Sequence, residues 1–390
     1  RDRPLKTEKK MHNIENSKNT LSHLLQRVQD QANRARDFLA PTHDLQKGTT
    51  DDGLPYVVME ASKGVPTQLF DINDVAFGQI SANAGIDVRT ARRLQEQVPT
   101  EFDSVVNALW RKTPNVRMLR THDHVGPSSK SVIGSNGKLR AFLSSKFKTF
   151  DNAHLLNATL PQLMESDAQW QVVSGDISER RMYLRLKSNV QTGEGAGVGD
   201  VMANGIGLSN SEVGEGSIAV YQVAFTLACL NGLQTQNKTR SSHITSARDS
   251  DDWGLLSGEA KDADNKALEL KVRDLVQAYA SRDNFNQVLE SMRLAKLDKI
   301  EGEKSEAVQS LGKVLQLTKK ETSNVLEGLF NTLNQAGYSS GSPVTRATLV
   351  NAVTNVANFA DIDDVDLWQN RGGQVLNLNR NDWARVAMVA

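Results

Sequence analysis

The chain has 390 residues, and its 46 lysines and arginines are balanced by 46 aspartates and glutamates. This length is enough for two or three domains with a buried core, and the neutral charge means that any affinity for nucleic acid must come from local charge. A single cysteine, Cys229, excludes an intrachain disulfide framework, and no apolar run reaches the length of about 18 residues that spans a membrane. We therefore expect a soluble cytoplasmic protein with no membrane partner, in which Cys229 is a small buried apolar side chain.

The N-terminal part begins with a polar segment and continues with helical periodicity. Residues 1–20 lack the apolar core of a signal peptide, so we predict a disordered N-terminal extension. Residues 21–110 are predicted to form a mainly helical N-terminal module with a strand at 56–60. The predicted helices of this module span residues 21–39, 72–84, 88–97 and 99–110.

Two of these helices carry groups of arginines. Arg27, Arg34 and Arg36 lie on the polar side of the first helix, and we interpret that side as a solvated surface. The helix over 88–97 also holds three arginines, which fits a DNA-reading helix-turn-helix. A helical packing element with a basic outer face is the simpler interpretation of the same pattern.

The segment 111–148 is strongly basic. It holds nine lysines and arginines and one acid, Asp123, a local excess of eight positive charges in a neutral chain. We predict strands over 116–120 and 139–143, and an Asn-Gly turn between them indicates that residues 132–133 pair with the second strand. A basic loop beside a strand suits a polyanion-binding groove, and a solvated charged surface is the alternative.

The following segment alternates between apolar and polar residues, as β-strands do. The predicted elements are a helix over 153–165, strands over 169–174, 181–187 and 201–208, and a strand or helix over 217–230. One face of the second of these strands presents Arg181, Tyr183, Arg185 and Lys187. Three cations and a tyrosine suit phosphate contacts and base stacking, although an ordinary exposed sheet face explains the alternation almost as well.

The C-terminal third is predicted to be a helical module without a catalytic motif. Its predicted helices span 259–300, 308–317, 324–334 and 344–359, and a short strand is predicted at 373–378. The fold class is therefore α+β, with a central antiparallel β-meander followed by a long helix and with helical N- and C-terminal modules. The predicted units are residues 1–20, 21–110, 111–258 and 259–390.

The chain offers little for chemistry. His122, His124 and Asp151 are metal-ligating residue types, but they lack a helical His-x-x-x-His pair and a cysteine partner. The glycine-rich residues 191–199 lack the Gly-Lys-Ser/Thr ending of a phosphate-binding loop, and Ser209 has no nucleophile-elbow motif. We therefore predict no catalytic residue, no metal and no cofactor.

Several short segments resemble a known family. They are Arg117-Met118-Leu119-Arg120, Arg140-Ala141-Phe142-Leu143-Ser144, Asp151-Asn152, Ser209-Asn210-Ser211-Glu212-Val213-Gly214, Cys229-Leu230-Asn231-Gly232 and Gly372-Gly373-Gln374-Val375-Leu376. From about Leu21 onward the chain resembles the phage/plasmid-like proteins, a domain of unknown function common on plasmids and phages. The resemblance implies a mobile-element protein with a DNA-handling role but no established activity. The predicted strand order is also similar to the core of single-strand annealing proteins, which form rings or filaments around a basic groove without consuming a nucleotide.

These observations and the resemblance lead to one main hypothesis and two alternatives. The main hypothesis is a non-enzymatic, homo-oligomeric DNA-binding protein of a phage or plasmid, in the cytoplasm of a bacterial or phage-infected cell. It would bind single-stranded DNA for annealing, recombination or protection, with duplex DNA as a further ligand. The alternatives are a structural or protein-interaction component that assembles through its C-terminal helices, and a metal-dependent nuclease that uses His122, His124 and Asp151.

The main hypothesis assigns a role to particular side chains. Phe147 and Tyr183 are predicted to stack on bases, and Phe142 and Phe150 are predicted either to stack or to lie in the core. The residues predicted to contact phosphates are Arg117, Arg120, Lys138, Arg140, Lys146, Lys148, Arg181, Arg185 and Lys187.

Overall fold

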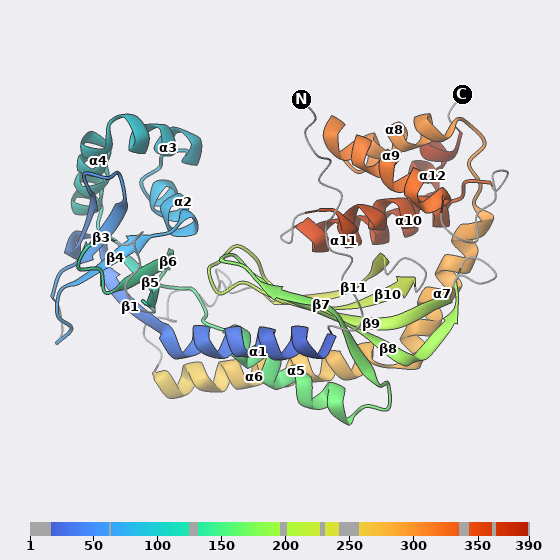
Figure 1. Ribbon diagram of the computed structural model, residues 1–390, viewed down its shortest axis with the longest axis horizontal. Coiled ribbons are helices and arrows are strands. Elements are labelled where there is room, and N and C mark those ends of the chain that lie inside the picture. Colours follow the sequence, from blue (N-terminus) through green and yellow to red (C-terminus); the bar gives the residue numbers. More distant parts are fainter. Residues whose placement is uncertain are drawn as a thin grey trace, which may run out of the picture.

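The computed structural model describes residues 17–61, 64–124, 132–195, 201–226, 231–241, 257–334, 343–360 and 364–388. Within these ranges the strands form two sheets and the helices cover them, which confirms the α+β class (Figure 1). Residues 125–131 of the predicted basic loop, Cys229 and most of the N-terminal extension lie outside the described residues. None of the described helices is both long enough and apolar enough to cross a membrane.

The first sheet is mixed and joins the N-terminal segment to the basic segment. Its strands, in order across the sheet, are β1 (Ala35–Pro41), β5 (Val116–Asp123), β6 (Gly137–Ser144), β4 (Gln68–Ile72), β3 (Pro55–Met59) and β2 (Leu45–Thr49). The helices α2 (Asp74–Asn83), α3 (Val88–Gln97) and α4 (Pro99–Lys112) pack against it. In its core the rings of Trp110 and Phe142 stack with centroids 5.5 Å apart.

The first sheet differs from the sequence predictions in three respects. The boundary placed at residue 110 falls between α4 and β5 of one structural unit, because Phe102 of α4 and Leu119 of β5 share a core. The segment 21–110 contributes four strands to this sheet, whereas one strand was predicted in it. Residues 132–133 do not pair with β6, which instead lies antiparallel to β5 and parallel to β4.

The second sheet is an antiparallel meander, as predicted. Its strands are β7 (Trp170–Ile177), β8 (Met182–Glu194), β9 (Val201–Asn210), β10 (Ile218–Thr226) and β11 (Asn231–Ser241), and each pairs with the next in sequence. One face packs on α1 (Ser17–Arg34), α5 (Asn152–Glu165) and the long helix α6 (Gly258–Tyr279) (Figure 1). Leu24, Leu156, Leu184 and Val276 lie together in this core.

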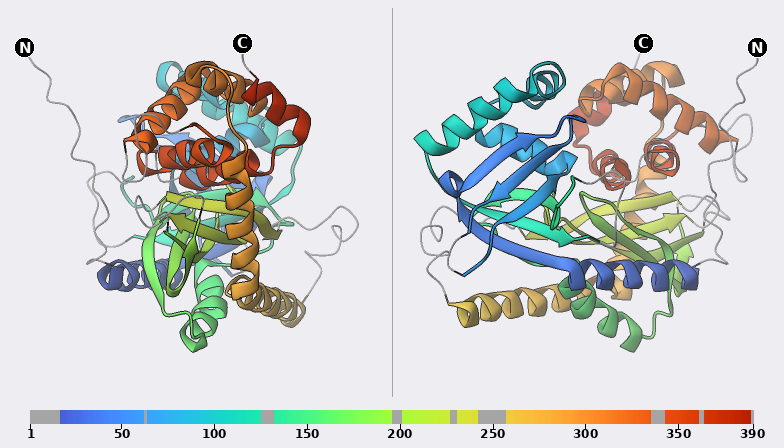
Figure 2. Two further views of the ribbon diagram at one scale, coloured as in Figure 1. Left: turned by 90° about the vertical axis from the view of Figure 1, so that its right-hand side faces the viewer. Right: turned by 60° about the vertical axis from the view of Figure 1, so that its left-hand side comes forward.

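The helix α1 and the strand β1 connect the two sheets. The helix ends at Arg34, whereas we predicted that it continues to Leu39. Residues beyond Arg34 pair with β5 instead, with Ala35 opposite His122, and Phe38 packs on Phe70 of the first sheet. Tertiary pairing therefore overrides the helical spacing at this point. The right-hand view of Figure 2 shows α1 running directly into the first sheet.

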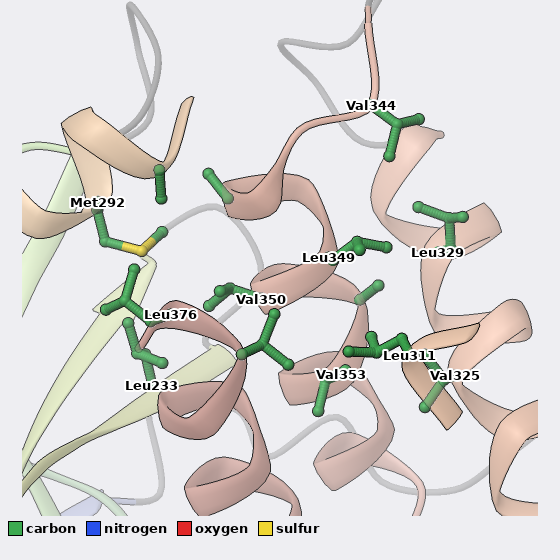
Figure 3. Packing of buried hydrophobic residues seen from close by; sticks show 14 of the residues in the cluster. Leu233, Met292, Leu311, Val325, Leu329, Val344, Leu349, Val350, Val353 and Leu376 are labelled. Carbon is green, nitrogen blue, oxygen red and sulfur yellow. The ribbon is translucent and has the colours of Figure 1, made fainter. Parts of the chain in front are cut away.

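The C-terminal helices form a separate core above the second sheet. They are α7 (Arg282–Leu297), α8 (Lys304–Val314), α9 (Lys319–Leu333), α10 (Arg346–Asn355), α11 (Val365–Leu376) and α12 (Arg380–Ala387). Leu349 and Val353 of the central helix α10 lie toward Leu329 and Val325 of α9, whereas Val350 lies toward Leu376 of α11 (Figure 3). Leu233 of β11 joins the same cluster and so links this core to the sheet.

The strand predicted at 373–378 is wrong, because α11 continues through Leu376. Two adjacent glycines, Gly372 and Gly373, lie within this helix, and the first of them lies at a close contact with α10. A Cβ atom at Gly372 would lie 2.3 Å from the side chain of Thr354, so only glycine allows α11 to pack this closely on α10.

Candidate nucleic-acid interface

A buried cluster of charged residues joins the two sheets, and Arg120 lies at its centre. Only 2 % of Arg120 is exposed. Its Nε donates to Asp37 Oδ1 at 3.0 Å and its Nη2 donates to Asp151 Oδ1 at 2.7 Å. Its Nη1 donates to the backbone oxygen of Glu212 at 3.0 Å. Burial acts to lower the pKa of Arg120, but Asp151, Asp37 and Glu212 raise this pKa above its usual value, so the guanidinium stays charged.

Arg140 and Glu212 form the second ion pair of this cluster. Arg140 Nη1 donates to Glu212 Oε2 and to His122 Nε2, both at 2.9 Å. The same carboxylate also accepts from Gln31 Nε2 at 2.5 Å and from the backbone N–H of Asn152 at 2.8 Å. Glu212 is therefore bonded to α1, β6 and the start of α5 at once. We call Arg120, Arg140, Glu212, Asp37 and Asp151 the junction cluster.

Residues next to the junction cluster also hold the turn between β9 and β10 in place. Asn210 Nδ2 donates to the backbone oxygen of Phe150 at 2.8 Å and to Asn152 Oδ1 at 3.1 Å. Asn210 and Glu212 therefore fix this turn onto the start of α5. The sequence motif 209–214 thus has a structural role.

The junction cluster changes the role of two predicted phosphate contacts. Arg120 and Arg140 are buried and engaged by carboxylates, so neither presents a free guanidinium to solvent. Removing one partner of a buried ion pair costs about 3–5 kcal/mol, because the other charge is left without compensation. We assign both arginines to the attachment of the first sheet to the second.

A pocket of about 410 Å³ opens beside this cluster, and we call it the junction pocket. It lies between α1, the first sheet and the turn after β7. Its lining residues are Arg27, Asp30, Gln31, Arg34, Asn73, His122, Lys138, Arg140, Ile177, Ser178 and Glu179. Four of these carry positive charge and two carry negative charge.

The imidazole of His122 responds to this environment. Burial, together with the nearby cations Arg140, Arg34, Arg120 and Lys138, lowers its pKa to about 3. His122 is therefore neutral at physiological pH, and its Nε2 accepts the hydrogen bond from Arg140. The ring adds no positive charge to the pocket.

The remaining cations of the junction pocket are more accessible than Arg140. Lys138 pairs with Glu179 at 2.6 Å, and both side chains are about half exposed. Arg27 forms an ion pair with Asp176 and also donates to the backbone oxygen of Ile177. Arg34 Nε donates to the carbonyl of Asp30 on its own helix. Among the described residues, Arg34 has no carboxylate within ion-pair distance.

Two residues predicted to lie on an exposed sheet face are covered. Arg185 is 3 % exposed, its Nη2 donates to Asp366 Oδ1 at 2.8 Å, and its guanidinium lies 4.5 Å from the ring centroid of Tyr183. The hydroxyl of Tyr221 also contacts Asp366, and Gly207 leaves the space that the Tyr221 ring occupies. Tyr183 and Arg185 therefore attach α11 to the sheet, and neither is accessible for base stacking or phosphate contact.

Phe147 and the two ambiguous phenylalanines are also in the interior. Phe147 is 3 % exposed and packs with Val75, Leu143 and Val213. Phe142 and Phe150 are fully buried, which decides in favour of a core role for both. None of these rings is accessible to a base.

The other predicted cations are partly exposed and mostly engaged. Lys148 pairs with Asp264 of α6 at 3.0 Å, and Arg117 Nη2 donates to the backbone oxygen of Phe142 at 3.3 Å. Arg181 Nη2 donates to the backbone oxygen of Glu215 at 3.1 Å. Lys146 and Lys187 are partly exposed.

A second pocket, of about 500 Å³, lies between the second sheet and α11, and we call it the sheet pocket. Its lining residues are Arg181, Ser209, Asn210, Ser211, Gly216, Ser217, Ala219, Asp364, Asp366, Leu367, Asn370 and Gln374. Ser211 Oγ, from the turn after β9, donates to the carbonyl of Arg180 in the turn after β7 at 2.6 Å, which ties these two turns together beside the sheet pocket.

The residues considered for a metal do not converge. His122 contacts Arg140, His124 Nε2 lies 3.1 Å from Ser135 Oγ, and Asp151 accepts from Arg120. Within the described ranges, no group of three or more histidine, cysteine, aspartate or glutamate side chains is placed to hold a metal ion.

The sequence prediction missed Arg27, Gln31 and Arg34 as part of a site. Their spacing of four and then three residues places them on one face of α1, and this spacing could have identified them as a group from the sequence. The spacing does not show that β6 lies opposite that face. Comparisons with known proteins give no further guidance, since no family model, curated protein or solved structure matches the chain.

Proposed function

We propose that the protein binds single-stranded DNA without catalysing a reaction, and that the junction pocket receives its phosphates. The observation that carries the proposal is the convergence of Arg27 and Arg34 of α1 with Lys138 of β6 on one pocket. Positive side chains fixed around a concave surface favour a polyanion. The ion pairs of Arg27 and Lys138 hold these side chains in place before a ligand arrives.

The shape of the pocket favours one strand over two. A pocket of about 410 Å³ has room for a short part of a single backbone. A duplex presents two backbones across a wide surface, and it would need an extended open basic face. The sheet face predicted to supply such a surface is instead covered by α11 at Arg185 and Tyr183.

Fluorescence anisotropy tests this proposal with one labelled oligonucleotide, presented alone and annealed to its complement. We expect tighter binding of the single strand, and a steep loss of affinity between low and physiological salt because bound counterions are released from phosphates. Undetectable binding at low salt, or an affinity that does not depend on salt, would contradict the proposal.

A structural or interaction role remains the second candidate, and one observation supports it. Leu294 and Leu297 of α7 and Phe330 of α9 are all more than half exposed on the C-terminal helices. Exposed apolar side chains on this part suit contacts between copies of the chain. We propose a homo-oligomer, and measurement of the molecular mass with and without single-stranded DNA separates the two functions. Assembly that ignores DNA, together with no DNA binding, favours the second candidate.

A further inference from the structure

The sheet pocket differs from the junction pocket in the chemistry that it offers. Its α11 wall presents the carboxylate of Asp364, the side-chain amides of Asn370 and Gln374, and the apolar side chain of Leu367. Leu367 is 44 % exposed, which is unusual for a leucine next to a polar cavity. The opposite wall supplies serine hydroxyls and Arg181 from the sheet.

The two amides are arranged as a donor and acceptor pair. Gln374 Nε2 donates to Asn370 Oδ1 at 3.2 Å, which fixes the orientation of both side chains. Asn370 Nδ2 then remains as a donor and Gln374 Oε1 remains as an acceptor. A planar ligand with both kinds of group on one edge matches this pair.

The helix that carries the amides is firmly held. Asp366, one turn before Asn370, accepts from Arg185 Nη2 at 2.8 Å beneath the pocket. The α11 wall is therefore preorganised, which reduces the entropy lost on binding.

The charges of the sheet pocket favour a phosphate less than those of the junction pocket do. Its lining has one cation, Arg181, beside the carboxylates of Asp364 and Asp366, and Asp366 is already paired with Arg185. A nucleobase is uncharged, its edge offers donors and acceptors, and its faces make apolar contacts. Carboxylate and amide oxygens accept hydrogen bonds from an exocyclic amino group such as N4 of cytosine, which thymine lacks.

The two pockets are close enough to serve one strand. Glu179 lines the junction pocket and Arg181 lines the sheet pocket. The Cα atoms of these two residues lie at most about 7 Å apart, so the linings of the two pockets meet at the turn between β7 and β8. A backbone in the first pocket can therefore place a base in the second.

We infer that the sheet pocket holds one unpaired base of the bound strand, and that it prefers a base with an exocyclic amino group. This inference rests on the proposed function. It also explains why the ligand would be single-stranded, because the edge that the pocket contacts is occupied in a duplex.

The test compares oligo-dC with oligo-dT of about eight nucleotides, a usual site size for a single-strand binding fold. Both are pyrimidines, and they differ where cytosine has its amino group. We expect oligo-dC to bind the wild-type protein at least about fivefold more tightly, the lower end for one good base contact. The double variant Asn370→Ala/Gln374→Ala is expected to bind both oligonucleotides alike, with the same salt dependence as the wild type.

The matched control is Asn286→Ala/Gln287→Ala, which removes an exposed amide pair from α7 and should keep the preference for oligo-dC. Thermal unfolding of each variant checks that the fold is intact. Equal binding of the two oligonucleotides by the wild type, or a preference that the α11 variant retains, overturns the inference while leaving the proposed function in place. Binding of neither oligonucleotide overturns both.

Discussion

Lys138 and Arg140 lie two residues apart on the same face of β6, yet the structure gives them different surroundings. Arg140 is almost fully buried against Glu212, whereas the side chain of Lys138 is 43 % exposed at the mouth of the junction pocket. A buried ion pair mainly determines which elements are held together, and an accessible cation remains available to a ligand. All of these residues are positively charged, so the burial of each side chain, and not its charge, distinguishes those that hold the fold together from those that are accessible to a ligand.

The largest expected effect comes from a substitution in the buried junction cluster. Arg120→Met leaves the carboxylates of Asp37 and Asp151 without their cation, so we expect the free energy of unfolding to fall by about 3–5 kcal/mol. Urea denaturation followed by circular dichroism measures this change. Arg111→Met, an exposed residue at the end of α4, is the control and should change stability by less than about 0.5 kcal/mol. A similarly small loss of stability for Arg120→Met would show that the junction cluster does not stabilise the attachment of the two sheets.

A smaller effect is expected from His122 as the pH falls. Its pKa in the folded protein is about 3, below the ordinary value of 6.5, so the unfolded chain binds the proton and the folded protein does not between these values. Stability should therefore decrease as the pH is lowered from about 6.5 towards 3, by at most about 1.4 kcal/mol per pH unit. Urea denaturation at several pH values detects this slope, and His122→Asn should reduce it. An unchanged slope in that variant would show that other groups cause the acid sensitivity.

The smallest change in stability is expected for the accessible cations of the junction pocket. Lys138→Ala breaks only a half-exposed ion pair with Glu179, and Arg34→Ala removes a hydrogen bond within α1. The double variant should lose less than about 1 kcal/mol of unfolding free energy. A decrease in the free energy of unfolding as large as that of Arg120→Met would mean that these cations stabilise the fold as the junction cluster does, which would contradict their assignment to ligand binding.

The sequence was sufficient to predict the meander and several helices, because their periodicities are long and regular. The strand β8 lies where it was predicted, although Tyr183 and Arg185 on its predicted exposed face are buried, and the long helix after the sheet is present. The end of α1 could not be predicted, since the choice of strand at Phe38 depends on pairing with β5. The helix at Gly372 depends in the same way on its contact with Thr354, which is distant in sequence.

The candidate site was predictable in composition but not in placement. Lys138 and Arg140 were identified as cations of a basic segment, and the structure places both on the lining of the junction pocket. Their partners Glu179 and Glu212 come from other segments of the chain, so no local sequence pattern separates the buried cation from the accessible one. The same limit explains Tyr183 and Arg185, because the helix α11 that covers them lies about 180 residues away in sequence.

The most direct test of the junction pocket is the salt dependence of single-strand binding in Arg34→Ala/Lys138→Ala. The slope of log affinity against log salt concentration should be smaller than in the wild type by about 1.4, with 0.7 for each lost phosphate contact. Arg93→Ala, which removes an exposed arginine of α3 outside the pocket, should leave the slope unchanged. A double variant that binds single-stranded DNA with the wild-type slope would contradict the assignment of this pocket to phosphate binding.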